Sequence, residues 1–139
     1  VKFDLPVILH VRKAHDVVIQ LLKKHRVKGG IVHAFSGSHQ QALLYIQLGF
    51  LLGIGGTVTY DKATRIRQLF SQLPLSAIAL ETDAPDMPLQ GQRSQRNSPE
   101  SLIPILGSLA DLRTEAPDSI AKITTHNATQ LFALPSSGN

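Results

Sequence analysis

Residues 30–54 read GIVHAFSGSHQQALLYIQLGFLLGI and contain one complete strand–helix–strand unit. The apolar run over residues 31–35 is short and rich in branched side chains, which predicts a buried strand. Ser38, with Gln41 three positions later, matches a capping box and therefore predicts the start of a helix. A second apolar run over residues 50–54 follows the glycine that ends this helix, and it predicts the next strand.

The same alternation of apolar runs and amphipathic stretches continues on both sides of this unit. Further strands are expected at residues 6–11 and 77–80, and helices at residues 14–22, 66–73, 101–115 and 118–134. Such alternation is typical of a parallel α/β fold, so the sequence predicts alternating β/α units in one domain over residues 1–134, with a flexible tail at 135–139. Four strands do not close a (β/α)₈ barrel, which takes about 250 residues, so we expect a small open sheet or about half of a TIM-type barrel.

The composition narrows the class of protein. With 42% hydrophobic and 17% charged residues among 139, the chain has enough apolar side chains for a buried core and is not disordered. Cysteine is absent, which excludes disulfides and thiolate chemistry and is compatible with the cytoplasmic location that we expect. No apolar run is long enough to span a membrane, and no signal-peptide pattern is visible. The net charge of +4 permits an anionic partner such as nucleic acid, although ordinary surface charge explains it equally well.

Polar side chains follow three of the expected strands. His10 and His33 lie at the ends of the first and second apolar runs, and Asp83 lies just past the fourth. Because the carboxyl ends of parallel strands line the active sites of α/β folds, these residues are candidate ligands for a divalent ion such as Zn, Mn or Mg. Each also has a structural interpretation, as a hydrogen-bonded histidine or as an aspartate in a turn. His15 and His25 fall on the first helix and are expected to face solvent.

Two further features concern anions. Arg12 follows His10 by two positions and therefore points to the same side of the chain. Its guanidinium could hold a phosphate oxygen, or it could pair with Glu81 or Asp83. Residues 36–38, Ser-Gly-Ser, precede a helix and form either an anion site or an ordinary helix cap. No G-x-S-x-G elbow is present, so a serine hydrolase is weakly supported.

Five segments of the chain resemble the TatD family of metal-dependent DNases. They are LPVILHVRKA at residues 5–14, GIVHAFSGS at 30–38, LETDAP at 80–85, RNSP at 96–99, and Asn127-Ala128 followed by Leu131-Phe132. The stretch DAPDMPL at residues 83–89 is similar to the YjjV-like branch of that family. The resemblance spans residues 5–134, and it is specific because the segments occur in the family's order.

The resemblance implies a TIM-type barrel with a divalent metal centre that hydrolyses phosphodiester bonds in DNA. By the family's motifs, His10 and His33 are metal ligands. Asp83 is implied to bind metal and the catalytic water, to orient the resulting hydroxide and to accept its proton. Arg12 and Arg96 are implied phosphate contacts. Zn, Mg and Mn all suit such ligands, and up to two ions are implied in the complete protein.

The chain departs from the family pattern in the ligands expected before His10. The family begins with a His-x-His pair and has a metal-bridging glutamate on an early strand, whereas the only acid before His10 is Asp4. We therefore expect the C-terminal half of a TatD-like hydrolase, which is inactive or very feeble by itself. Half of a barrel also leaves strand edges and apolar faces uncovered, so it should associate with the missing N-terminal half or with a second copy of the chain.

Two other functions are compatible with the sequence. The segment could be a nucleic-acid-binding or interaction module that keeps the scaffold without the catalysis, and its binding would then depend steeply on salt. It could also belong to a hydrolase of esters, amides or lactones, because a fold does not determine a substrate. Activity that is lost in His33→Ala or Asp83→Ala indicates an enzyme, whereas binding that survives both changes indicates a module.

Overall fold

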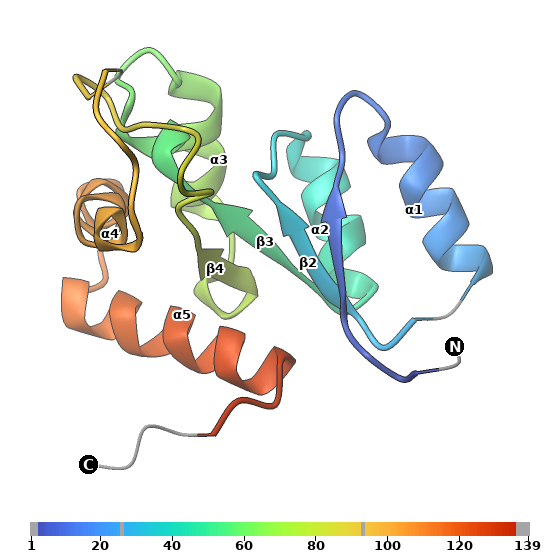
Figure 1. The fold of residues 1–139 in the computed structure, drawn as a ribbon. Helices are drawn as coiled ribbons and strands as arrows, with labels where there is room; N and C mark the ends of the chain where they lie inside the picture. Colours follow the sequence, from blue (N-terminus) through green and yellow to red (C-terminus); the bar gives the residue numbers. More distant parts are fainter. Residues whose placement is uncertain (1–2, 26, 93, 136–139) are drawn as a thin grey trace.

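The computed structural model describes residues 3–25, 27–92 and 94–135 of the chain. Its centre is a four-stranded parallel sheet in the order β1-β2-β3-β4 (Figure 1). The strands are β1 (Val7–His10), β2 (Gly30–His33), β3 (Phe50–Ile54) and β4 (Ile78–Leu80). A helix lies between each strand and the next along the chain, and all three pairings are parallel. The predicted architecture of alternating β/α units is therefore confirmed.

The helices of the described residues lie behind and beside this sheet, with α1 and α2 toward its β1 end and α4 and α5 at its β4 end (Figure 1). They are α1 (His15–Lys24), α2 (His39–Gln47), α3 (Thr64–Gln72), α4 (Leu102–Ala110) and α5 (Pro117–Leu131), with short 3₁₀ segments η1 (Gly56–Thr59), η2 (Leu75–Ala77) and η3 (Pro99–Ser101). Ser38 and Gln41 form the predicted capping box at the start of α2. No described helix is both long enough and apolar enough to cross a membrane.

The last two helices are shorter than the sequence predicts. The chain reaches α4 through the 3₁₀ segment η3, which begins with a proline. After α4 the chain leaves the helix, and Arg113 donates hydrogen bonds to the backbone carbonyls of Phe70 (2.6 Å) and Leu73 (2.9 Å) at the end of α3. This anchor explains why one long helix over 101–115 does not form. Of the tail expected at 135–139, residues 136–139 lie outside the described residues.

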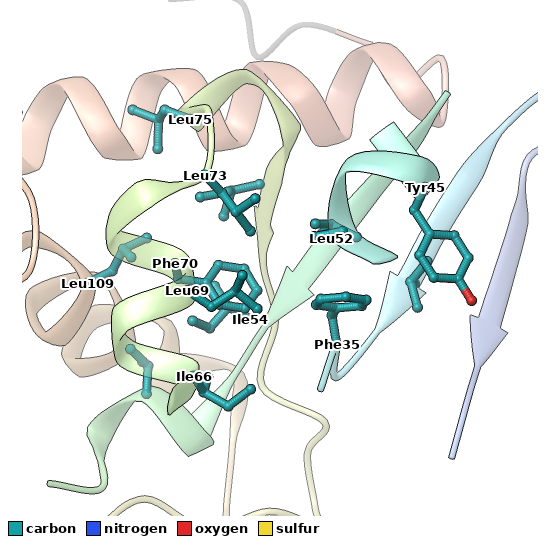
Figure 2. Packing of buried hydrophobic residues seen from close by; sticks show 14 of the residues in the cluster. Phe35, Tyr45, Leu52, Ile54, Ile66, Leu69, Phe70, Leu73, Leu75 and Leu109 are labelled. Atoms are coloured by element: carbon teal, nitrogen blue, oxygen red, sulfur yellow. The ribbon is translucent and has the colours of Figure 1, made fainter. Parts of the chain in front are cut away.

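One face of the sheet packs against the helices and forms the core. Side chains alternate between the two faces of a strand. Val32, Leu52 and Ile54 belong to a single buried cluster to which all five helices contribute. Figure 2 shows Ile54 of β3 beside Leu69 and Phe70 of α3. The side chains at the alternate positions of the strands, including His10 and His33, lie on the opposite face of the sheet, away from this cluster.

β1 is an edge strand, as expected for half of a barrel, and it is therefore less buried than its apolar sequence predicts. It pairs with β2 on one side only among the described residues. As a result Ile8, which points away from the core, is 67% exposed, and Phe3 and Leu5 before the strand are exposed as well. An apolar sequence alone does not distinguish an edge strand from a central one. The expected association of this open edge with a partner stays a prediction.

His15 is buried, which corrects the expectation that it faces solvent. It is 7% exposed, and its Nδ1 lies 3.3 Å from the hydroxyl of Tyr45. Its ring also meets Phe35 edge-on at a centroid distance of 5.2 Å. His15 shares its helix face with Ile19, one turn further along, and this face of α1 packs on the core. His25 is exposed, as expected.

Candidate metal centre

His10 and His33 stand side by side at the carboxyl ends of neighbouring strands. The sheet register pairs them directly, and their ring centroids are 5.5 Å apart. The residues before them, Leu9 and Val32, pack in or against the core. Because side chains alternate, both rings lie on the uncovered face of the sheet. This confirms that the first two strands bring these residues together.

The ring of His33 lies between two carboxylates. Its Nδ1 is 2.9 Å from Oε1 of Glu81, and its Nε2 is 3.3 Å from Oδ1 of Asp83. Both residues follow β4, two positions apart. The side chains of His33 and Glu81 are 17% and 16% exposed, whereas that of Asp83 is 37% exposed. Asp83 therefore faces solvent in front of the ring, and Glu81 supports the ring from behind.

Glu81 is a site residue that sequence reasoning did not identify. Its Oε1 also accepts a hydrogen bond of 2.6 Å from the backbone N–H of Ala34. Burial raises the pKa of Glu81, and the hydrogen bonds from Ala34 and His33 lower it in part. Gly53 of β3 provides the space, because a Cβ at that position would lie 2.3 Å from Oε2 of Glu81. A glycine inside a strand marks such a close approach, and it was the available signal.

Two residues at the site adopt left-handed backbone conformations that favour glycine. Asp83 has φ 56° and Ala34 has φ 45°. Aspartate tolerates this region better than most residues, whereas alanine is strained there by about 1 kcal/mol. At Ala34 this conformation accompanies the hydrogen bond from its N–H to Glu81. Strain of this kind concentrates at functional sites, which supports a role for these two loops beyond chain reversal.

The facing atoms of His33 and Asp83 fit two ligands of one metal ion. When Glu81 is ionised and accepts the ring proton at Nδ1, Nε2 is an acceptor that faces a second acceptor, Oδ1 of Asp83. A metal ion between the two atoms would stabilise such a pair. A tetrahedral ion with bonds of about 2.0–2.1 Å separates its ligand atoms by roughly 3.3–3.4 Å. Glu81 then occupies the place of the carboxylate that commonly orients a metal-bound histidine.

The remaining predicted site residues are less closely assembled. Within the described residues, no three His, Asp or Glu side chains converge tightly enough to hold an ion. His10 thus adjoins the pair without completing it, and its role as a third ligand stays a prediction. Arg12 forms no ion pair with Glu81 or Asp83 in the described part of the chain; it lines a cavity beside the sheet edge. Arg96 is exposed.

Asn97, the neighbour of Arg96, holds the loop that carries Asp83. Its side chain is buried, and Nδ2 donates to the carbonyl of Thr82 at 2.7 Å. The same group donates to the carbonyls of Asp86 and Met87. Asn97 therefore contacts the chain on both sides of Asp83. The sequence contained the RNSP motif at residues 96–99, but it did not reveal that Asn97 is the residue that binds the loop around Asp83.

Replacing Gly53 by alanine should displace Glu81 and release the ring of His33. The new Cβ would meet the end of a flexible side chain, so the fold should survive. We expect the long-range ¹H–¹⁵N spectrum of His33 to show a ring protonated at Nδ1 in the original chain and a mixture of tautomers in Gly53→Ala. Metal affinity should fall about 10–100-fold, as it does when the outer partner of a ligand is lost.

Gly107→Ala is the matched control. A Cβ at Gly107 of α4 meets nothing within 4 Å. This change should leave the His33 spectrum unaltered and stabilise the helix by up to about 1 kcal/mol. An unaltered His33 spectrum in Gly53→Ala would show that Glu81 does not fix the ring.

Comparison with known proteins relates these features to one family. The family described as TatD related DNase matches residues 1–133. The metal-dependent hydrolase YjjV of Escherichia coli (strain K12) is 47% identical over 135 residues, which make up 96% of this chain and 52% of that protein. The 3′-5′ ssDNA/RNA exonuclease TatD of Rahnella sp. (strain Y9602) is 38% identical in an alignment of 141 positions that covers 96% of this chain and 53% of that protein. The chain thus spans about half the length of these relatives.

Solved structures agree with the fold. The crystal structure of the TatD homologue YjjV from Escherichia coli K12 matches with a TM-score of 0.91 and 46% identity, over 96% of this chain and 52% of that chain. A TatD family hydrolase from Entamoeba histolytica matches with a TM-score of 0.81 at 18% identity, which supports the fold alone. The match over residues 1–133 and the similarity to these relatives show that this chain belongs to the TatD family.

Proposed function

We propose that this chain supplies part of the active site of a metal-dependent hydrolase that cleaves phosphodiester bonds in DNA. The observation that carries the proposal is the facing pair of His33 Nε2 and Asp83 Oδ1, which lie 3.3 Å apart. They stand at the carboxyl ends of the strands, where α/β enzymes place their active-site residues. The name of the Rahnella relative, a 3′-5′ ssDNA/RNA exonuclease, favours a nucleic-acid substrate. Zn, Mg and Mn are the candidate ions.

Each residue of the site has a distinct task in this reaction. A bound divalent ion lowers the pKa of a coordinated water and so supplies hydroxide near neutral pH. His33, with His10 beside it, and Asp83 would hold that ion. Asp83 is the more exposed carboxylate, and it would orient the water and accept its proton. Glu81 keeps the His33 ring in place from behind.

Hydrolysis by this chain alone should be absent or very weak. Two facing ligands and one neighbouring histidine carry too little charge and closure to hold an ion tightly. The complete activity is therefore a property of a protein in which further βα units, an N-terminal half or a second copy of the chain, complete the ligand set. The open edge at β1 is where such units would pair with this sheet.

A chimera tests the proposal. The portion of the Rahnella exonuclease that matches this chain is replaced by this chain, and hydrolysis of single-stranded DNA is measured with Mg²⁺, Mn²⁺ or Zn²⁺. We expect hydrolysis that disappears with EDTA and returns with metal. A folded chimera that binds metal and releases no nucleotide, beside an active unmodified host, contradicts the proposal. Hydrolysis of ester or amide substrates alone would indicate the non-nuclease alternative.

A second candidate is nucleic-acid binding without catalysis. It is favoured by the absence, within the described residues, of a converged group of three ligands. In this case binding of single-stranded DNA should survive both His33→Ala and Asp83→Ala and should weaken steeply with salt.

A further inference from the structure

We infer that a cavity beside the metal centre binds a backbone phosphate of the substrate strand. The cavity has a volume of about 700 Å³, within the range of small-ligand sites. It lies between the first turns of α1 and α2, which follow β1 and β2, the strands that carry His10 and His33. The ligand's identity as nucleic acid rests on the proposed function, but the preference for an oxyanion rests on the cavity itself.

The charge of the cavity favours an anion. Arg12, Lys13 and Arg65 line it, and none of them forms an ion pair with a carboxylate in the part of the chain that is described. The cavity also contains Asp16, whose Oδ1 accepts a hydrogen bond of 2.7 Å from the amide of Gln41. Three cations thus stand against one carboxylate that is already engaged.

Arg65 is held in place before any ligand binds. Its Nη1 donates to the carbonyl of Gly37 at 3.0 Å, and its Nη2 donates to the carbonyl of Ser36 at 2.8 Å. A guanidinium has five N–H donors, so others remain for a ligand. A cation fixed by two carbonyls loses little freedom on binding, which makes it a pre-organised partner for phosphate.

Two polar features at this place lack side-chain partners in the described part of the chain. Among the described residues, no side-chain hydrogen bond caps α1, a helix of ten residues, whereas Ser38 and Gln41 form a capping box on α2. The first N–H groups of α1 are therefore open to an oxyanion. Independently, Nε2 of His15 is buried without a hydrogen-bond partner, and His15 is 7% exposed and lines this cavity. A phosphate oxygen would accept hydrogen bonds from the first N–H groups of α1, which no side chain of the described residues caps.

A phosphate bound in this cavity would fix the position of the DNA strand along the active site. The cavity is lined by the segments that follow β1 and β2, the strands that carry His10 and His33. The next phosphodiester along the DNA strand would therefore lie near His33 and Asp83. Binding energy gained away from the reacting atoms positions them for reaction. Lys13 and Arg65 would accordingly bind the DNA backbone and take no part in the chemical step.

An NMR titration of the chain in EDTA tests the inference without metal or catalysis. The probes are inorganic phosphate and a single-stranded thymidine hexanucleotide, and the readout is the backbone amide shifts. We expect both probes to shift amides of residues 12–17 and 36–38. Lys13→Gln and Arg65→Gln should each weaken hexanucleotide binding about tenfold. Lys24→Gln, at the opposite end of α1, should weaken it by less than about twofold.

Three outcomes overturn the inference. They are shifts confined to other residues, equal weakening by Lys24→Gln, and binding of inorganic phosphate without binding of the hexanucleotide. The first two indicate diffuse surface charge, and the third indicates a free-phosphate site. Because no metal is present, failure here is distinct from failure of the proposed hydrolysis, which the chimera measures separately.

Discussion

Replacing Asp83 by asparagine in the chimera should lower its metal-dependent hydrolysis of DNA by about 1,000-fold or more. Asparagine has nearly the same size, so the change removes charge and basicity while the loop keeps its shape. Oδ1 of Asp83 faces Nε2 of His33 at 3.3 Å, and the asparagine oxygen would be a weaker ligand that accepts no proton. Metal binding and proton transfer should therefore fail together.

Asp86→Asn is the matched control for this experiment. Asp86 is an exposed carboxylate of the same loop, and its N–H donates to the carbonyl of Asp83 at 2.9 Å. The control has the same change of charge at nearly the same place, so it corrects for altered attraction between DNA and the loop. We expect its hydrolysis rate to stay within about threefold of the unsubstituted chimera.

The assay separates the two interpretations of Asp83. Hydrolysis and metal affinity are measured on both variants, each shown to be folded by its far-ultraviolet circular dichroism. If Asp83→Asn retains more than about a tenth of the rate, Asp83 is a turn residue and the catalytic base lies elsewhere. If it loses metal but regains the full rate at high metal concentration, Asp83 is a ligand without a role in proton transfer.

The elements of the fold could be predicted because their signals are local. The capping box at Ser38 and the apolar run that forms β3 each lie within a few residues, and the structure places both as expected. The pairing of His10 with His33 was also accessible, because parallel strands end at a common edge. The exposure of β1 could not be predicted from its own residues, since an edge strand and a central strand can have the same apolar pattern; it followed only from the expectation of half a barrel.

The residues that hold the candidate ligands in place could not be predicted, because they act through contacts between distant segments of the chain. Glu81 reaches Ala34, 47 positions away, through space left by Gly53 on a third segment. Asn97 binds the carbonyl of Thr82 across 15 positions. A sequence motif records that these residues occur together, but only the arrangement of the segments in space shows that Glu81 contacts the ring of His33. Likewise, the burial of His15 follows from how α1 meets α2, which its helical spacing alone leaves open.

Replacing Asn97 by aspartate should destabilise the chain by about 3 kcal/mol and release the loop around Asp83. The side chains have the same shape, but aspartate has no N–H to donate. A buried carboxylate would instead face the carbonyls of Thr82, Asp86 and Met87, which all accept. Because small domains are stable by only about 5–15 kcal/mol, a loss of this size is readily measured.

The effect should be visible both globally and at the loop. Urea unfolding measures the loss of stability, and ¹⁵N relaxation of residues 82–87 measures the loop's new motion. Gln95→Glu makes the same amide-to-carboxylate change at an exposed neighbour, and it should alter stability by less than about 0.5 kcal/mol. Lowered stability with an unchanged loop would mean that Asn97 serves the fold alone. Since Asp83 must keep its oxygen in front of His33, we instead expect Asn97→Asp to lose metal affinity in parallel with loop order.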